Sequence, residues 1–115
     1  MHEPVRRAKL AICEDERIVA LDIKTFLSRS GFEVTGLYPS AEELLEAVEA
    51  AKADRPELVL MDVHLEGPMD GVEAAARLYE RWSIPVIFLT AYADASTIDR
   101  AKLTQPFGYV IKPFD

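Results

Sequence analysis

Carboxylates and other polar groups stand at the ends of four apolar runs of this 115-residue chain. Asp62 closes the run LVLMD, and Glu14 and Asp15 follow the run KLAIC. Thr90 follows PVIFL, and Lys112 follows GYVI. An acid after a strand is, on its own, usually a helix cap or a solvated turn. Four such ends in one chain indicate a shared site instead.

The residue types in this set favour phosphoryl chemistry. Three carboxylates in one place repel one another unless a cation neutralises them. Oxygen ligands without clustered histidine or cysteine favour Mg²⁺. A carboxylate beside Mg²⁺ and a lysine can act as a nucleophile, and the oxygens of a transferred phosphoryl group need positive charge and hydrogen-bond donors. Lys112 supplies the charge and Thr90 a hydroxyl, so the set predicts that Asp62 accepts a phosphoryl group.

Five apolar runs that alternate with helical patterns must position these residues. The runs that contain residues 59, 87 and 110 lack polar alternation, which is typical of strands covered on both faces. Strand–helix alternation predicts a parallel doubly wound α/β sheet, whose ligands bind at the carboxyl ends of the strands. The expected strands span residues 9–13, 32–38, 57–61, 85–89 and 108–111.

Capping signatures mark the starts of the connecting helices. Ser40 with Glu43, and Asp70 with Glu73, match the capping box that precedes a helix. Asp94 is a candidate cap for a shorter helix. The first helix is indicated by apolar residues at helical spacing, which are Val19, Ile23, Phe26 and Leu27.

Composition limits the classes of partner. Half of the residues are apolar, which fits one domain over residues 1–115. The formal net charge of −7 argues against binding to nucleic acid or to anionic lipid. Cys13, the single cysteine, cannot form an intrachain disulfide, and no segment approaches the roughly 20 apolar residues that span a membrane. We therefore expect a cytoplasmic domain without a nucleic-acid or membrane partner.

Four segments together resemble the receiver domain of two-component response regulators, and the likeness extends over essentially the whole chain. The segments are ICEDE, LVLMDVHLEGPMDGVEAA, PVIFLTAYAD and GYVIKPFD. The resemblance implies a flavodoxin-like five-stranded sheet of order 2-1-3-4-5. It also implies that Asp62 is phosphorylated by the phosphohistidine of a sensor histidine kinase or of a phosphotransfer domain.

The resemblance also assigns roles to individual residues. It implies that Asp62, Glu14, Asp15 and the backbone carbonyl of His64 hold Mg²⁺. Thr90 and Tyr109 match the family's switch pair, in which the hydroxyl moves to the phosphoryl group and the ring swings inward.

Other polar residues near these segments receive weaker expectations. The side chains of His64 and Tyr92 are hypothesised to modulate the lifetime of the phosphoryl group from either side of the entrance. An acidic stripe on the second helix is expected to be a solvated face, and it consists of Glu42, Glu43, Glu46 and Glu49.

Two other functions remain open at this point. A Mg²⁺-dependent phosphohydrolase of the haloacid-dehalogenase type also uses an aspartate at a strand end, but His64 stands where its second acid would be. The chain is also short for a substrate-selecting cap. A receiver-like interaction domain that is never phosphorylated is disfavoured because both Asp62 and Lys112 are present. A signalling domain without steady turnover, rather than an enzyme, is the leading prediction.

The last residue raises a question about coverage of the sheet. The chain ends at Asp115, where a receiver would begin its fifth helix, so one face would be covered by the first helix alone. Soluble monomers rarely expose a contiguous apolar strip. We therefore expect a fragment of a longer protein with an output or kinase domain, or a homodimer in which a second copy covers the strip.

Overall fold

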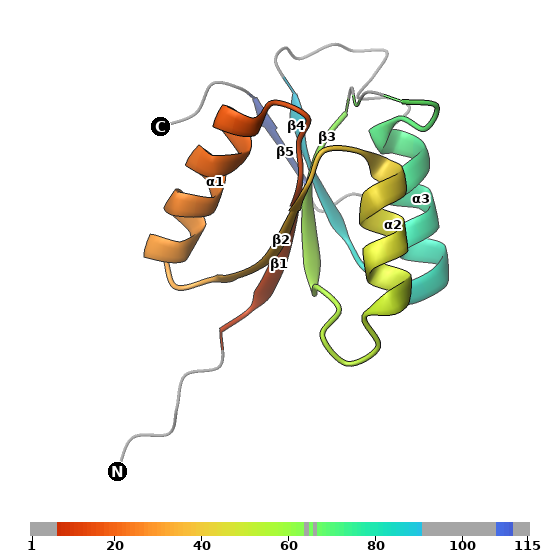
Figure 1. Ribbon diagram of the computed structural model, residues 1–115, viewed down its shortest axis with the longest axis horizontal. Helices are drawn as coiled ribbons and strands as arrows, with labels where there is room; N and C mark the ends of the chain where they lie inside the picture. Colours follow the sequence, from red (N-terminus) through yellow and green to blue (C-terminus); the bar gives the residue numbers. More distant parts are fainter. Residues whose placement is uncertain (1–6, 64, 66, 91–107, 112–115) are drawn as a thin grey trace.

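The computed structural model describes residues 7–63, 65, 67–90 and 108–111, with the backbone alone for residues 90 and 108–111. Its strands form one parallel sheet in the order β2-β1-β3-β4-β5 (Figure 1). This order confirms the expected flavodoxin-like doubly wound fold. The strands are β1 (Lys9–Cys13), β2 (Glu33–Tyr38), β3 (Leu58–Asp62), β4 (Val86–Thr90) and β5 (Gly108–Ile111).

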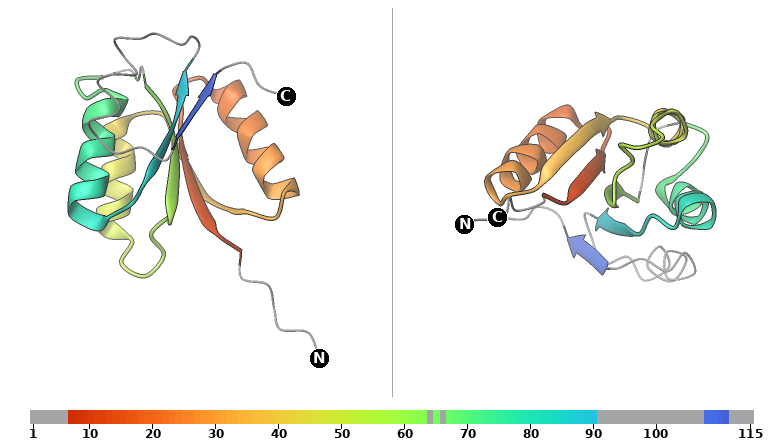
Figure 2. Two further views of the ribbon diagram at one scale, coloured as in Figure 1. Left: turned by 180° about the vertical axis from the view of Figure 1, so that it is seen from behind. Right: turned by 90° about the horizontal axis from the view of Figure 1, so that it is seen from below.

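Helices cover both faces of the sheet. Helix α1 (Arg17–Arg29) lies on one face, and α2 (Ala41–Ala50) and α3 (Gly71–Trp82) lie on the other (Figures 1 and 2). Right-handed connections between parallel strands produce this arrangement. The helix that Asp94 was expected to cap lies outside the described residues.

The N-cap hydrogen bonds of both predicted capping boxes are confirmed. The Ser40 hydroxyl oxygen accepts a hydrogen bond from the Glu43 amide at 3.2 Å, and a carboxylate oxygen of Asp70 accepts one from the Glu73 amide at 3.0 Å. These bonds satisfy amide groups that have no partner within the first turn of a helix. They place the starts of α2 and α3 at the end of the sheet where the strands finish.

Replacement of the α2 cap should lower stability measurably. Ser40→Ala removes the acceptor for the Glu43 amide and is expected to lower the free energy of unfolding by about 1 kcal/mol. Urea denaturation measures this change. Ser28→Ala, at an exposed position within α1, is the control and should leave stability nearly unchanged. Equal stability of the two variants would contradict the role of the cap.

Two apolar cores flank the sheet. The larger lies between the sheet and helices α2 and α3, and the smaller lies beneath α1. Phe26, expected to face the core, is 52% exposed, because the buried face of α1 is centred on Ala20, Ile23 and Leu27. On the α1 side, Leu58 and Ile87 are only half-buried. This partial burial agrees with the expectation that α1 is the one described helix on this face of the sheet.

The far ends of α2 and α3 are tied together by Arg55. Its Nε donates a hydrogen bond to the carbonyl oxygen of Val48 at 2.8 Å, near the end of α2. Its guanidinium also lies 5.3 Å from the centre of the Trp82 ring, at the end of α3. Hydrogen bonding together with a cation–π contact holds the two helices in a fixed relation.

Candidate functional site

Asp62 is a buried carboxylate at the carboxyl end of a central strand. It is the last residue of β3, and its side chain is 7% exposed. Because β1 and β3 pair Cys13 with Met61, the next residues along the two strands are Glu14 and Asp62. Asp62 and Glu14 therefore lie at the carboxyl edge of the sheet, where parallel sheets bind their ligands.

Acidic side chains gather directly after β1. Glu14 is 2% exposed, and its amide donates a hydrogen bond to the carbonyl oxygen of Tyr38 at 3.0 Å. Carboxylate oxygens of Glu14, Asp15 and Glu16 all lie within 4.8 Å of one another. The Glu16 amide also donates to a Glu14 carboxylate oxygen at 3.4 Å. This donor set consists of oxygen atoms alone and fits a hard divalent cation.

The negative field of these acids reaches the neighbouring thiol. Cys13 is fully buried in the larger core, as expected for a small core residue. Burial, and next the carboxylates of Asp62 and Glu14, raise the pKa of the Cys13 thiol to about 12. The thiol is therefore neutral at physiological pH. Its raised pKa shows that the charges of these carboxylates act together on the region around Cys13.

The start of α3 packs directly against the backbone of Asp62. The Gly71 amide donates a hydrogen bond to the carbonyl oxygen of Val63 at 3.1 Å. A Cβ atom at Gly71 would overlap the carbonyl oxygen of Asp62 and lie 3.1 Å from Val63 backbone atoms. Only glycine permits this approach without a shift of the backbone.

A methyl group at this position should displace the strand end. Gly71→Ala is expected to lower the free energy of unfolding by about 1–3 kcal/mol because backbone atoms cannot move aside. Helix propensity acts in the opposite direction, by about 1 kcal/mol in favour of alanine. Urea denaturation measures the net change.

Gly36→Ala is the matched control for this prediction. A Cβ at Gly36 would meet the ring of Tyr38, which is a side chain and can move. We expect a smaller loss of stability in Gly36→Ala than in Gly71→Ala. A Gly71→Ala variant as stable as the original chain would show that the approach tolerates a side chain.

The structure describes the backbone of some of the remaining predicted residues and does not describe the others. Thr90 is the last residue of β4, and its backbone pairs with Ile111 of β5. Tyr109 lies in β5, and its backbone pairs with Phe88 of β4, the strand next to β3. His64, Tyr92 and Lys112 lie outside the described residues. The structure thus brings Glu14 and Asp15 together and places the Thr90 backbone at the same edge of the sheet.

Two further acids near this edge of the sheet were not predicted as site residues. Glu16 joins the acidic cluster, and the run EDE was visible in the sequence. Glu42 approaches the loop that precedes α3, with 3.4 Å between a carboxylate oxygen and the Met69 amide nitrogen. That contact joins residues 27 positions apart, and no local pattern signals it.

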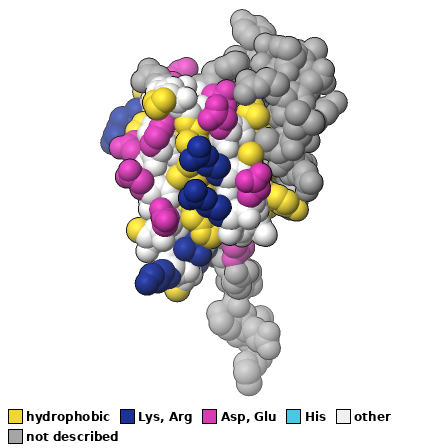
Figure 3. All heavy atoms as spheres, turned by 90° about the vertical axis from the view of Figure 1, so that its right-hand side faces the viewer, with side chains coloured by type: hydrophobic (Ala, Val, Ile, Leu, Met, Phe, Trp, Pro, Cys, Tyr) yellow, Lys and Arg dark blue, Asp and Glu magenta, His cyan; other side chains and the backbone are white. Residues whose placement is uncertain are grey.

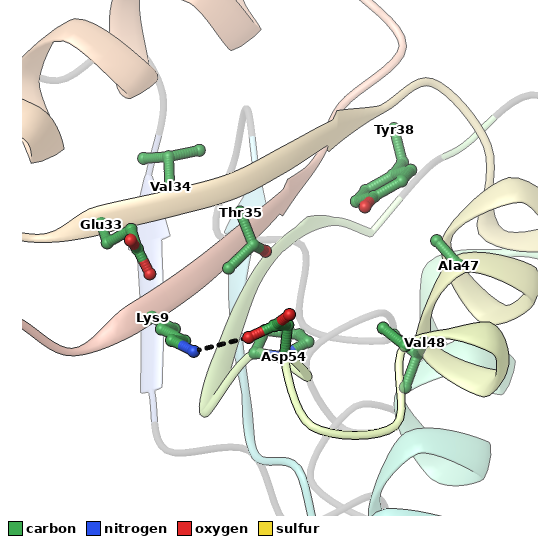
Figure 4. Close-up of a pocket in the computed structure, with 10 residues that line it drawn as sticks. Lys9, Glu33, Val34, Thr35, Tyr38, Ala47, Val48 and Asp54 are labelled. Atoms are coloured by element: carbon green, nitrogen blue, oxygen red, sulfur yellow. Dashed lines mark hydrogen bonds and ion pairs between the residues drawn. The ribbon is translucent and has the colours of Figure 1, made fainter.

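A separate cavity lies between β2 and α2. It has a volume of about 500 Å³ and is lined mainly by β2 and α2, with the ion pair of Lys9 and Asp54 at its mouth (Figure 4). The Lys9 ammonium and the Asp54 carboxylate lie 3.1 Å apart. Lys9 and Glu33 begin their strands, whereas the acidic cluster follows the strand ends. The cavity is therefore not part of the candidate site.

Within the part of the chain that the structure describes, no helix has the length and apolar character needed to cross a bilayer.

Comparison with known proteins agrees with the fold. The response regulator receiver domain family matches residues 10–115. The transcriptional regulatory protein PdtaR of Mycobacterium tuberculosis is 33% identical over 106 residues, which cover 92% of this chain and 50% of PdtaR. CseB of Streptomyces coelicolor is 35% identical over 102 residues, which cover 89% of this chain and 42% of CseB. The chain therefore spans about half the length of these relatives, or less.

Solved structures show the same architecture. The signal receiver domain of a modulated diguanylate cyclase from Desulfovibrio desulfuricans is 39% identical, with a TM-score of 0.84 over 96% of this chain and 85% of that chain. The chemotaxis response regulator CheY4 of Vibrio cholerae has the same fold, with a TM-score of 0.83 and 21% identity over 96% of this chain and 90% of that chain.

A parallel doubly wound sheet with acids gathered at its carboxyl edge agrees with the fold of a receiver. The chain belongs to the response regulator receiver domain family of two-component signalling. This membership confirms the expected family, whose role is that of a phosphoacceptor. It gives no support to the alternative of a haloacid-dehalogenase-type phosphohydrolase.

Proposed function

We propose that Asp62 is the phosphoacceptor of this receiver domain. The observation that carries the proposal is a buried carboxylate at the end of β3, one residue beyond the Cys13–Met61 pair, as Glu14 of the acidic cluster is on the neighbouring strand. Family membership supplies the class of reaction. The phosphoryl donor is a phosphohistidine of a sensor histidine kinase or of a phosphotransfer domain.

The transfer is a single substitution at phosphorus. An oxygen of Asp62 forms a bond to phosphorus, the bond from phosphorus to the histidine nitrogen breaks, and the nitrogen keeps the electron pair. Glu14, Asp15, Asp62 and the His64 carbonyl would hold Mg²⁺, which when bound neutralises the charge that develops on the phosphoryl oxygens. The oxygen-only cluster around Glu14 fits that ion.

Residues on later strands complete the proposed site. Lys112 supplies a positive charge to the phosphoryl group, and Thr90 supplies a hydroxyl donor from the end of β4. Thr90 and Tyr109 act as the switch pair, so that phosphorylation changes the surface around β4 and β5. His64 and Tyr92 modulate the lifetime of the acyl phosphate by their position at its entrance.

The product of this chemistry is a change of conformation rather than a released molecule. The domain catalyses only its own phosphorylation and dephosphorylation and is not an enzyme with steady turnover. We propose that residues 1–115 form one receiver domain that works in the cytoplasm within a longer protein, attached to an output or kinase domain. Its relatives PdtaR and CseB, of which the chain spans half or less, support that arrangement. A homodimer through the α1 side of the sheet would cover the half-buried Leu58 and Ile87.

Measurement of intact mass after incubation with acetyl phosphate tests the proposal. With Mg²⁺ present, we expect one phosphoryl adduct per chain, and with Mg²⁺ removed by a chelator we expect almost none. Uptake should stop at one equivalent. Continuous release of phosphate from phosphomonoesters would contradict the proposal, and a complete lack of adduct would favour a receiver-like domain that is never phosphorylated.

A further inference from the structure

One acid of helix α2 is set apart from the others by its environment. The face formed by α2 and α3 carries side chains of both charges (Figure 3). Glu43, Glu46 and Glu49 are exposed there, as a solvated stripe predicts, but Glu42 is half-buried. The prediction of a solvated side chain is therefore wrong for Glu42.

The carboxylate of Glu42 lies against the loop between β3 and α3. One of its oxygens accepts a hydrogen bond from the Met69 amide at 3.4 Å. A Cβ atom at Gly67 would lie 3.4 Å from each of its two oxygens. Gly67 itself has a φ of +98°, which favours glycine. Glu42 therefore forms a hydrogen bond with the loop at Met69 and lies on the side of Gly67 where a side chain would project.

The loop is anchored at both ends. The Val63 amide donates to the carbonyl oxygen of Leu89 at 3.2 Å, directly after Asp62, and the Asp70 side chain caps α3 at the other end. Glu42 adds a side-chain acceptor from a different element at Met69, the residue before this cap. In Figure 1 the start of α2 and this loop lie at the end of the molecule where β3 finishes.

The loop that Glu42 contacts is continuous with the strand end that carries Asp62, because Val63 follows Asp62 directly. A carboxylate at this position of α2 provides an acceptor for a backbone amide of that loop.

We propose that Glu42 is a positioning residue that holds loop residues 67–70 against α2 and thereby supports phosphoryl transfer to Asp62. This role rests on the proposed function of the site. A backbone held in place before the reaction lowers the reorganisation that the transfer requires. Glu42 acts through the loop and does not touch the reacting atoms.

Three variants separate the contact from the charge. Glu42→Ala removes both, whereas Glu42→Gln removes the charge and keeps a side-chain oxygen that can accept from the Met69 amide. Glu46→Ala is the matched control, because Glu46 is an exposed glutamate of the same helix. The first measurement is hydrogen exchange of the Met69 amide, and the second is the rate of adduct formation with acetyl phosphate and Mg²⁺.

In Glu42→Ala we expect the Met69 amide to exchange about fivefold faster, as for the loss of one ordinary hydrogen bond. We expect adduct formation to be slower by roughly three- to tenfold, because the loop is less well positioned. Glu42→Gln should restore most of the protection and most of the rate. Glu46→Ala should match the original chain in both measurements.

The two measurements distinguish the failure of this inference from the failure of the proposed function. If the original chain takes up a phosphoryl group and Glu42→Ala does so at the same rate, the positioning role is overturned while the phosphoacceptor stands. If Glu42→Gln is as slow as Glu42→Ala although Met69 is protected, charge rather than contact matters and the proposal is again overturned. If the original chain takes up no phosphoryl group, the proposed function fails and the positioning role fails with it, even where Met69 protection falls in Glu42→Ala.

Discussion

Asp62→Asn should abolish the phosphoryl adduct that forms from acetyl phosphate. An asparagine amide has the shape of aspartate but lacks the anionic oxygen that attacks phosphorus. We expect loss of the adduct to below one hundredth of the original level, because a covalent intermediate cannot form without its nucleophile. Intact mass, measured with Mg²⁺ present, gives the extent of the reaction.

The matched control for this prediction is an exposed aspartate. Asp22 lies on α1 and is exposed, so Asp22→Asn should take up the same amount of phosphoryl group as the original chain. Thermal unfolding of both variants should remain cooperative, which would show that a missing adduct does not reflect a lost fold. An adduct that persists in Asp62→Asn would place the phosphoacceptor at another residue.

Phe88→Ala should cause the largest loss of stability among single substitutions of the core. Phe88 lies in β4, an inner strand of the sheet, and is fully buried between the sheet and helices α2 and α3. Removal of its ring leaves a cavity and is expected to lower the free energy of unfolding by about 3–5 kcal/mol. That is a large part of the roughly 5–15 kcal/mol that stabilises a typical domain.

Phe26→Ala provides the same chemical change at a position that is 52% exposed. We expect it to lower the free energy of unfolding by less than about 1 kcal/mol, because little apolar surface returns to water and no cavity forms. Urea denaturation at one temperature compares the two variants directly. Similar losses at both positions would mean that Phe88 does not anchor the larger core.

Loss of the Phe88 ring should also affect the strand end that carries Asp62. Phe88 pairs with Met61, the residue before Asp62, and the following pair joins Asp62 with Leu89. A cavity beneath this part of the sheet should therefore loosen the strand end that carries Asp62. We expect Phe88→Ala to take up the phosphoryl group more slowly than Phe26→Ala under conditions where both variants are folded.

Local sequence patterns predicted a parallel sheet and the edge at which the residues that follow its strands lie, whereas the order of the strands came from the resemblance to receiver domains. Apolar periodicity and capping boxes are local signals, and carboxyl ends of parallel strands share one edge whatever the details of packing. Ser40 with Glu43 and Asp70 with Glu73 could therefore be recognised from spacing alone.

Only the tertiary structure decided how residues distant in sequence pack around that edge. The contact of Glu42 with Met69 spans 27 positions, and the approach of Gly71 to the backbone of Asp62 depends on where α3 meets β3. The rotation of α1 about its axis decided that Phe26 faces solvent, although its spacing fits a helix. These features follow from the relative placement of whole elements, which local periodicity does not encode.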